Sequence, residues 1–246
     1  MDNSMYDKLL ELPLFQGLTK TQLTVILEKV KIEFRYYEPK TYIVKQNEPC
    51  TALIFLLNGR LRACATDTSH QFSLVEEICQ QTLIEPYSLF GMQQNFHATY
   101  RAITKSSVLI LKKKYIIPLL CKYEIFNLNY LNILSNGTQN LQQRLWNTHV
   151  GGTLDRMVNF LLMRCTYLQG PKELGITMED FANLVGDTRI NISRTLNELQ
   201  DKGLLELKRK IIRIEDLNNL VKEMKLQEAT LKKNKRKSTD IKEKQS

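Results

Sequence analysis

A stretch of 28 residues in the C-terminal half restricts the fold of this chain more than any other feature. It covers residues 176–203 and reads ITMEDFANLVGDTRINISRTLNELQDKG. Thr177 and Asp180 have the spacing of a helix-capping pair, and Gly186 is a typical helix stop. Apolar residues then recur at helical spacing at positions 192, 196 and 199. The stretch therefore predicts a helix-turn-helix with one buried stripe on its second helix.

The outward face of that second helix carries residue types that can read DNA. Arg makes bidentate contacts with guanine, Asn with adenine, and an apolar tip can meet a thymine methyl group. The candidate contacts on or beside this face are Thr188, Arg189, Ile190, Asn191, Ser193, Arg194 and Asn197. The solvated side of an ordinary helical hairpin is the alternative interpretation, but it does not explain an outward Ile190.

The segment that follows completes the motif. Residues 204–214, LLELKRKIIRI, have the pattern of two short strands around a basic tip of Lys208, Arg209 and Lys210. A helix-turn-helix followed by a β-hairpin is a winged helix. Its basic tip would contact DNA phosphates, which supply affinity through counterion release. We therefore predict double-stranded DNA as a partner.

Composition and charge set limits on the class of protein. The chain has 246 residues, of which 43% are hydrophobic and 25% charged, so it can bury genuine cores. It has no run of about 18 apolar residues and no signal-peptide pattern, so we expect a cytoplasmic protein without a membrane contact. The net charge is +9, yet residues 148–221 carry ten basic and ten acidic side chains. DNA binding must then depend on local placement of charge.

The cysteines and histidines do not indicate a metal site or a catalytic centre. Five cysteines are scattered without a CxxC pair, and three histidines lie far apart in the sequence. Nothing resembles a phosphate-binding glycine loop or a nucleophile elbow. We predict no enzyme activity, no metal and no cofactor.

The first half of the chain has the pattern of an antiparallel β structure. Short β-rich runs alternate with turn signals between about residues 30 and 112. Asn58-Gly59, between two apolar runs, predicts a hairpin with a type I′ turn, in which both residues have positive φ. Seven or eight such strands form a roll that can enclose a small-ligand pocket.

These patterns predict an α+β fold in four parts. An N-terminal antiparallel β-roll, resembling a jelly roll, occupies residues 1–114. A long helical region at 115–147 carries more apolar residues than a lone surface helix should expose, which indicates dimerisation; packing of the helix on its own β-roll is the alternative. A winged helix-turn-helix occupies 148–221, and 222–246 form a basic tail that we expect to be disordered or a fraying helical extension.

This order of parts resembles the Crp/Fnr superfamily of bacterial transcription regulators. The resemblance covers residues 10–217 and is strongest at 176–206, with further landmarks at LNGRL (57–61), LFG (89–91) and RAIT (101–104). It implies a homodimer on an inverted-repeat operator, with RNA polymerase as a further partner. It also implies a phosphate contact by Thr177 and recognition roles for Arg189 and Arg194. Ile190 stands where many members have a base-reading Glu, so the operator should differ.

The effector is left open by the same resemblance. The family's nucleotide cassette would require Glu after Gly91 and Arg shortly before Ala98, whereas this chain has Met92 and Phe96. A buried phosphate without its Arg would be uncompensated, which argues against cyclic AMP. No cysteine precedes Cys50, which argues against an Fnr-type cluster. Haem remains an alternative, with His70, His97 or Cys79 as axial ligands.

The sequence thus predicts a homodimeric, sequence-specific transcription regulator with an unidentified small-molecule effector, or none. Two alternatives remain open. One is a nonspecific or architectural nucleic-acid-binding protein that uses the wing and the basic tail. The other is a ligand-binding or protein-interaction module in which the winged helix is a docking surface.

Overall fold

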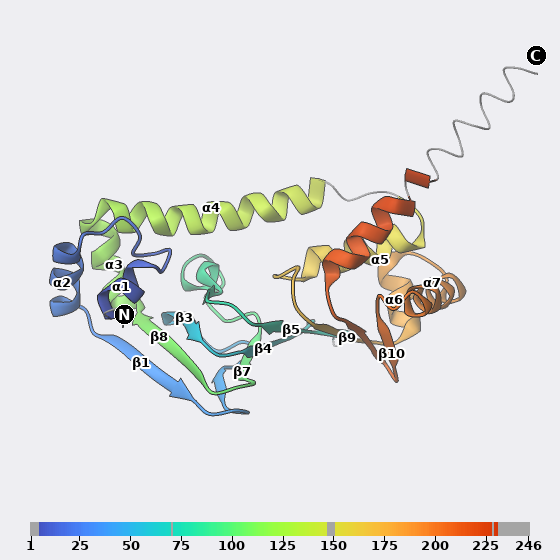
Figure 1. Ribbon diagram of the computed structural model, residues 1–246, viewed down its shortest axis with the longest axis horizontal. Coiled ribbons are helices and arrows are strands. Elements are labelled where there is room, and N and C mark those ends of the chain that lie inside the picture. The colour runs from blue at the N-terminus through green and yellow to red at the C-terminus, as the bar shows by residue number, and fades with distance from the viewer. Residues whose placement is uncertain (1–4, 70, 147–150, 228, 231–246) are drawn as a thin grey trace, which may run out of the picture. The chain divides into compact units, whose positions relative to one another are not determined.

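A computed structural model describes residues 5–69, 71–146, 151–227 and 229–230 (Figure 1). The chain divides into two compact units. The N-terminal unit contains Met1–Ala65 and Ile78–Trp146, and the C-terminal unit contains Thr66–Glu77 and Asn147–Ser246. The predicted α+β class, with an antiparallel β domain, a long helix and a C-terminal helix-turn-helix, is confirmed.

The N-terminal unit is built from strands framed by helices at both ends of its sequence. The helices are α1 (Met5–Leu10), α2 (Lys20–Lys29), α3 (Lys113–Lys122) and α4 (Glu124–Trp146), with a short 3₁₀ helix η1 (Pro86–Leu89). Its strands are β1 (Ile32–Tyr37), β2 (Tyr42–Val44), β3 (Ala52–Asn58), β4 (Leu61–Thr66), β6 (Thr82–Ile84), β7 (Thr99–Ala102) and β8 (Ser106–Lys112). Strand β6 and η1 were not predicted from the sequence.

Two antiparallel sets of strands form the roll. One has the order β1-β8-β3-β6, and in the other β7 lies between β4 and β2. The central strand β3 is buried along most of its length, and its Phe55 lies opposite Leu109 of β8. The Phe15 ring lies 6.4 Å from that of Phe55 in a tilted arrangement and 5.8 Å from that of Phe126 of α4, edge to face. The turn between α1 and α2, backed by α4, therefore covers part of the first sheet.

The predicted hairpin at Asn58-Gly59 is wrong. β3 pairs with β8 and β6, whereas β4 pairs with β7, so the two strands that flank this turn belong to different sheets. Only Gly59 has positive φ, at 103°, and the Asn58 side chain accepts a hydrogen bond from the Gly59 N–H. A Cβ on Gly59 would lie 2.7 Å from the Ser106 Cα. Glycine is needed here because the backbone passes so close to β8.

The region predicted as one dimerisation helix consists of two helices. The chain leaves α3 at Tyr123, which has an extended backbone, and α4 begins at the next residue. The first turns of α4 pack on the unit: Phe126 and Tyr130 are buried, and the Tyr130 hydroxyl donates to the Pro86 carbonyl. From Ser135 onward almost every side chain of α4 is exposed.

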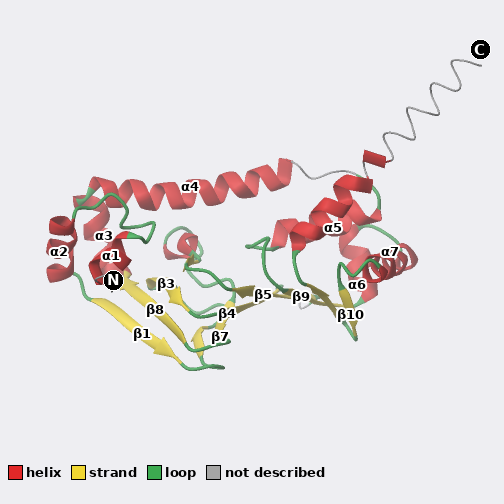
Figure 2. Ribbon diagram, viewed as in Figure 1, coloured by secondary structure: helices red, strands yellow, loops and turns green. Residues whose placement is uncertain are grey.

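The C-terminal unit is a winged helix with an extra strand. It contains α5 (Thr153–Arg164), β9 (Lys172–Ile176), α6 (Met178–Val185), α7 (Arg189–Asp201), β10 (Glu206–Lys208) and β11 (Ile211–Ile214) (Figure 2). The wing strands were predicted, but β9 was not. β9 pairs with β11 on one side and with β5 (Phe72–Ile78) on the other, so the strands of this unit have the order β10-β11-β9-β5.

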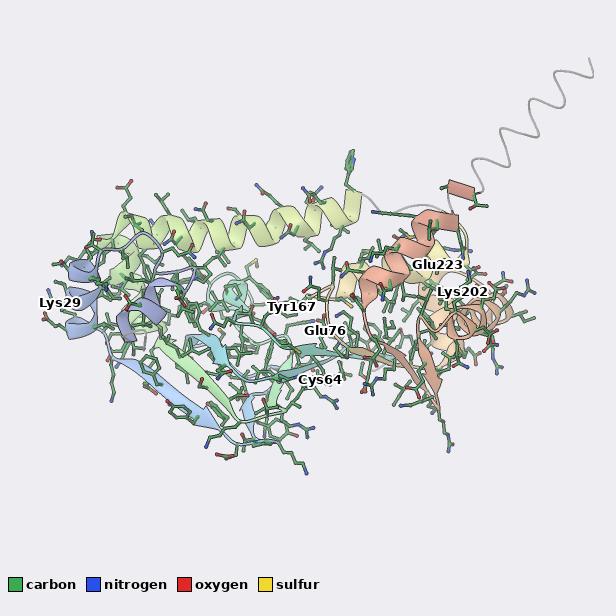
Figure 3. All side chains as sticks on the ribbon, in the orientation of Figure 1. Lys29, Cys64, Glu76, Tyr167, Lys202 and Glu223 are labelled. Atoms are coloured by element: carbon green, nitrogen blue, oxygen red, sulfur yellow. The ribbon has the colours of Figure 1, made fainter. Side chains whose placement is uncertain are left out.

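A buried pair of charges ties β5 to β9. Glu76 of β5 accepts hydrogen bonds from the backbone N–H groups of Thr166 and Tyr167 at 2.9 and 3.0 Å (Figure 3). The Lys172 ammonium lies 3.8 Å from the same carboxylate and donates to two backbone carbonyls. Both side chains are buried. A segment from the first third of the chain is therefore an integral part of the C-terminal unit.

A helix at residues 217–227 closes this unit. Its Leu217, Leu220 and Met224 are buried in the same core as α5, α6 and α7. Lys202, directly after α7, forms an ion pair of 2.5 Å with Glu223 on this helix (Figure 3). The tail boundary predicted at 222 thus falls inside a helix, and residues 231–246 lie outside the described residues. Among the helices that the structure describes, none is both long and apolar enough to cross a bilayer.

Candidate nucleic-acid interface

The helix-turn-helix is fixed by hydrogen bonds at the helix ends. Thr177 precedes α6, and its hydroxyl oxygen accepts from the Asp180 N–H at 3.1 Å. Gly186 ends α6 in the left-handed region, with φ of 67°, as its position in the sequence predicted. Thr188 then caps α7 by accepting from the Asn191 N–H at 3.2 Å. These caps satisfy backbone groups that the helices leave open.

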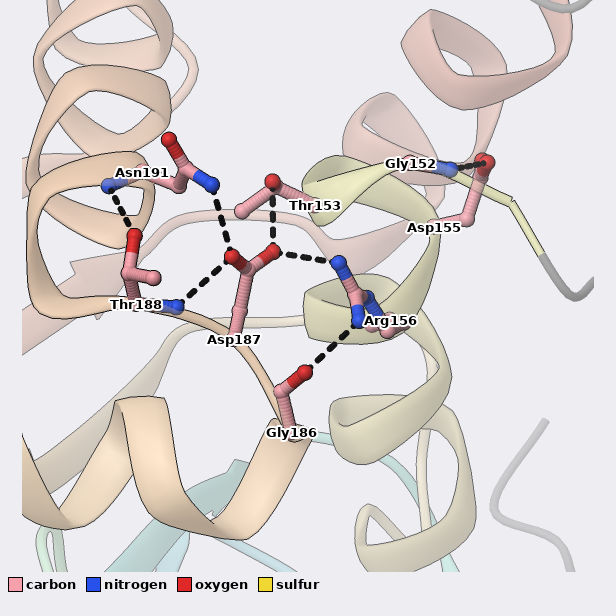
Figure 4. Close-up of polar contacts among 8 residues, drawn as sticks. All are labelled: Gly152, Thr153, Asp155, Arg156, Gly186, Asp187, Thr188 and Asn191. Atoms are coloured by element: carbon pink, nitrogen blue, oxygen red, sulfur yellow. Dashed lines mark hydrogen bonds and ion pairs between the residues drawn. The ribbon is translucent and has the colours of Figure 1, made fainter.

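Asp187, in the turn between α6 and α7, binds the turn to α5 (Figure 4). One carboxylate oxygen accepts from Thr153 at 2.7 Å and pairs with Arg156 at 2.5 Å. The other oxygen accepts from the Thr188 N–H and the Asn191 side chain. Arg156 also donates to the Gly186 carbonyl at 2.7 Å. The angle at which α7 leaves the turn is therefore held by one acidic residue.

The hydrogen bond from Thr153, followed by those from Asn191 and Thr188, lowers the Asp187 pKa from 3.8 to about 2. Because the folded-state pKa is lowered, the carboxylate stabilises the unit above pH 3.8, and this contribution is lost as the pH falls towards 2. We expect Asp187→Asn to be less stable than wild type at pH 7 and the difference to shrink across this window. Urea unfolding at a series of pH values measures it.

Glu179→Gln on the exposed part of α6 is the matched control for the loss of one negative charge. It should lower stability at pH 7 much less than Asp187→Asn does. An Asp187→Asn curve that runs parallel to wild type from pH 7 to pH 2 would show that this carboxylate does not stabilise the turn.

The structure separates the predicted recognition residues by exposure. The stripe of Ile192, Leu196 and Leu199 is buried, as predicted. The exposed members of the candidate set are Thr188, Arg189, Ile190, Ser193, Arg194 and Asn197. Ile190 is 71% exposed, which is unusual for a large apolar residue on a helix of a folded domain. Asn191 is half-buried, and its amide donates to Asp187, so its side chain supports the turn.

The basic tip of the wing and the starts of both helices surround one hollow. Lys208, Arg209 and Lys210 are exposed, and Lys210 has φ of 60° in the turn between β10 and β11. An open hollow of about 300 Å³ is lined by Thr177, Arg189 and Lys210, together with Ile176, Met178 and Glu179. Three predicted contacts from three different elements thus come together. Lys208 pairs with Glu206 at 3.0 Å on the wing.

The candidate metal or haem ligands and the candidate nucleotide cassette have less support than the DNA-binding face. In the described part of the chain no three His, Cys, Asp or Glu side chains are grouped as metal ligands would be. His70, one of the haem candidates, lies outside the described residues. Met92 is fully exposed and Phe96 is buried, and neither side chain carries a polar group that could bind the ribose or the phosphate of a nucleotide.

Two family models match the chain. Residues 34–123 match the cyclic nucleotide-binding domain. Residues 155–223 match the Crp-like helix-turn-helix domain. Together these two matches include nearly all of the roll, α3 and nearly all of the winged helix, but not α4.

Several solved structures are similar to the chain. The catabolite activator protein of Thermus thermophilus is 19% identical, with 85% of this chain and 96% of that chain covered and a TM-score of 0.45. A putative regulator of the Crp/Fnr family from Eubacterium rectale is 22% identical, with 86% and 97% covered and a TM-score of 0.47. DNR from Pseudomonas aeruginosa is 20% identical, with 89% and 97% covered and a TM-score of 0.45. No curated protein sequence matches the chain significantly.

Proposed function

Because the chain belongs to the Crp/Fnr superfamily, with a cyclic nucleotide-binding domain and a Crp-like helix-turn-helix, it is a DNA-binding transcription regulator, and we propose that it reads a specific sequence as a homodimer. The observation that carries the proposal is the exposed face of α7. There Arg189, Ile190 and Arg194 point away from a buried apolar stripe on the same helix. We propose no enzymatic role.

Base reading is assigned to Arg194, Asn197 and Ile190, and positioning to the residues around the hollow. Exposed Arg and Asn side chains can form bidentate contacts with guanine and adenine in the major groove. Thr177, Arg189 and the wing lysines would contact phosphates and set the register of the helix on the duplex. Ser193 and Thr188 add hydroxyl donors, whereas Asn191 acts by holding Asp187.

Dimerisation is assigned to α4. One stripe of this helix consists of positions spaced alternately by three and four residues: Leu131, Leu134, Leu141 and Leu145, with the polar Thr138 between the two pairs. This is the heptad spacing of a helix that pairs with another helix. Leu131 and Leu141 are about half exposed in the single chain, at 50% and 48%. A second copy of α4 would cover them, and two winged helices would then meet successive major grooves.

Selection from a random double-stranded DNA pool, followed by binding across a salt series, tests the proposal. We expect an inverted repeat with half-sites about one helical turn apart. Arg194→Ala should weaken binding to the selected site about 5- to 150-fold, corresponding to about 1–3 kcal/mol, and relax the preference at one base position. Lys208→Ala, the matched control, should weaken all sequences alike and reduce the salt slope by about one unit.

The architectural alternative predicts a different result in the same experiment. No sequence would be enriched, and affinity would fall steeply with salt whether or not Arg194 is present. Truncation after residue 230, which keeps the helix that closes the C-terminal unit, would then remove most of the affinity. Under our proposal the truncation weakens binding to all sequences equally, and the preference for the selected site survives.

A further inference from the structure

Glu85 is the most unusual residue of the N-terminal unit that the proposed function does not use. It lies between β6 and η1 and is 5% exposed. Its backbone is left-handed, with φ of 39° and ψ of 59°, and Pro86 follows it. This left-handed conformation favours glycine and disfavours residues with a Cβ. Strain of this kind persists only where the surrounding structure holds the residue in place.

The Glu85 side chain is held by four hydrogen-bond donors. One carboxylate oxygen accepts from the His97 N–H at 2.7 Å and from the Ser88 hydroxyl at 3.0 Å. The other accepts from the Ala98 N–H and the Tyr100 hydroxyl, both at 3.0 Å. Two successive backbone N–H groups and two hydroxyls thus converge on one buried negative charge. Such a set of donors forms an anion site, because hydrogen bonds to an ionised acceptor are stronger than those between neutral groups.

We propose that these four donors form a binding site for a phosphate-like anion and that the Glu85 carboxylate occupies it permanently. A phosphate group and a carboxylate both present oxygens that accept several hydrogen bonds at once, so the same donors can serve either. The site lies within the segment that matches the cyclic nucleotide-binding domain, whose ligands carry a phosphate. Glu85 then replaces an external ligand with a charge supplied by the chain.

The consequence for regulation rests on the proposed function, whereas the anion site does not. An effector shifts a conformational equilibrium only by its differential affinity for the two states. Because the four donors already bind the Glu85 carboxylate, a phosphate-bearing molecule can form no hydrogen bonds with them. The roll would therefore support operator binding without a small molecule, and the wild-type protein takes no phosphate there.

Replacing Glu85 with glycine tests the proposal in the full-length protein. Glycine suits the left-handed backbone and frees all four donors, so Glu85→Gly should bind inorganic phosphate saturably. The amide signals of His97 and Ala98 in NMR spectra report occupancy directly. We expect them to shift with phosphate in Glu85→Gly and not in wild type, with chloride at equal ionic strength as the reference. Adding Tyr100→Phe should weaken phosphate binding by about 10-fold or more, because one hydrogen bond to a charged acceptor is lost.

Glu85→Gln controls for shape. Its amide still fills the site but cannot accept from all four donors, so we expect lower stability than wild type and no stabilisation by phosphate. If Glu85→Gly does not fold in chloride, recovery of folding by phosphate supports the site. The proposal is wrong if phosphate neither binds to Glu85→Gly nor restores its folding. It is also wrong if phosphate shifts the amide signals of His97 and Ala98 in wild type.

Operator binding separates this inference from the proposed function. We expect wild type to bind its selected DNA without any added small molecule. Glu85→Gly should bind that DNA at least 10-fold more weakly in chloride and regain affinity in phosphate, where NMR shows occupancy. If phosphate binds to Glu85→Gly but does not change its DNA affinity, the anion site exists but has no regulatory role. If wild type shows no preference for any DNA sequence, the proposed function is rejected, whatever the result with phosphate.

Discussion

Glu76→Ala is expected to destabilise the C-terminal unit by about 3–5 kcal/mol, the usual cost of removing one partner from a buried ion pair. The substitution leaves the Lys172 ammonium buried beside an empty space, and it also leaves the N–H groups of Thr166 and Tyr167 without their acceptor. Chemical denaturation measures the loss. Hydrogen exchange of the β9 and α5 amides should accelerate most, which localises the effect to this unit.

Two further variants make the result specific. Glu173→Ala removes a half-buried carboxylate from the neighbouring strand and should cost much less than Glu76→Ala. Combining Glu76→Gln with Lys172→Met removes both charges, so we expect part of the lost stability to return. If Glu76→Ala had the same free energy of unfolding as wild type, β5 would contribute little to the stability of the unit. The winged helix would then be complete without this strand.

The winged helix could be predicted from the sequence because its signals are local. Thr177, Gly186 and the apolar stripe of α7 each act within one or two helical turns, and the structure has them where the spacing predicted. β9 was missed because its partner, β5, comes about a hundred residues earlier in the chain. Gly175 on β9 looks like a turn residue in sequence, yet it lies within the strand, opposite Ser73 of β5.

The N-terminal unit illustrates the same limit. The strands could be predicted from their composition, but the partners of β3 and β4 could not, because pairing depends on contacts far apart in sequence. Glu85 before Pro86 has the pattern of an ordinary turn. Its role becomes visible only when the chain returns at residues 97–100 and brings the donors to its carboxylate.

Replacing both Leu131 and Leu141 with lysine is expected to convert the proposed dimer into a monomer of 28.7 kDa and to weaken operator binding by about 100-fold or more. Both positions lie on the heptad stripe of α4 and are half exposed in the single chain, so the roll should tolerate the change. Two facing stripes could not bury four ammonium groups. Sedimentation equilibrium gives the mass, and titration with the selected DNA gives the affinity.

The matched control places the same charges on the other side of the helix. Asn136→Lys with Gln143→Lys adds two lysines at exposed positions of α4 that lie away from the stripe, so the dimer should persist. Two linked half-sites bind far more tightly than one, because the second contact is made within an already formed complex. The monomer should therefore bind a single half-site as well as wild type does, while it loses the advantage of the inverted repeat. If affinity fell equally for a single half-site and for the inverted repeat, the leucines would be needed for folding of the chain, and α4 would not be the dimer interface.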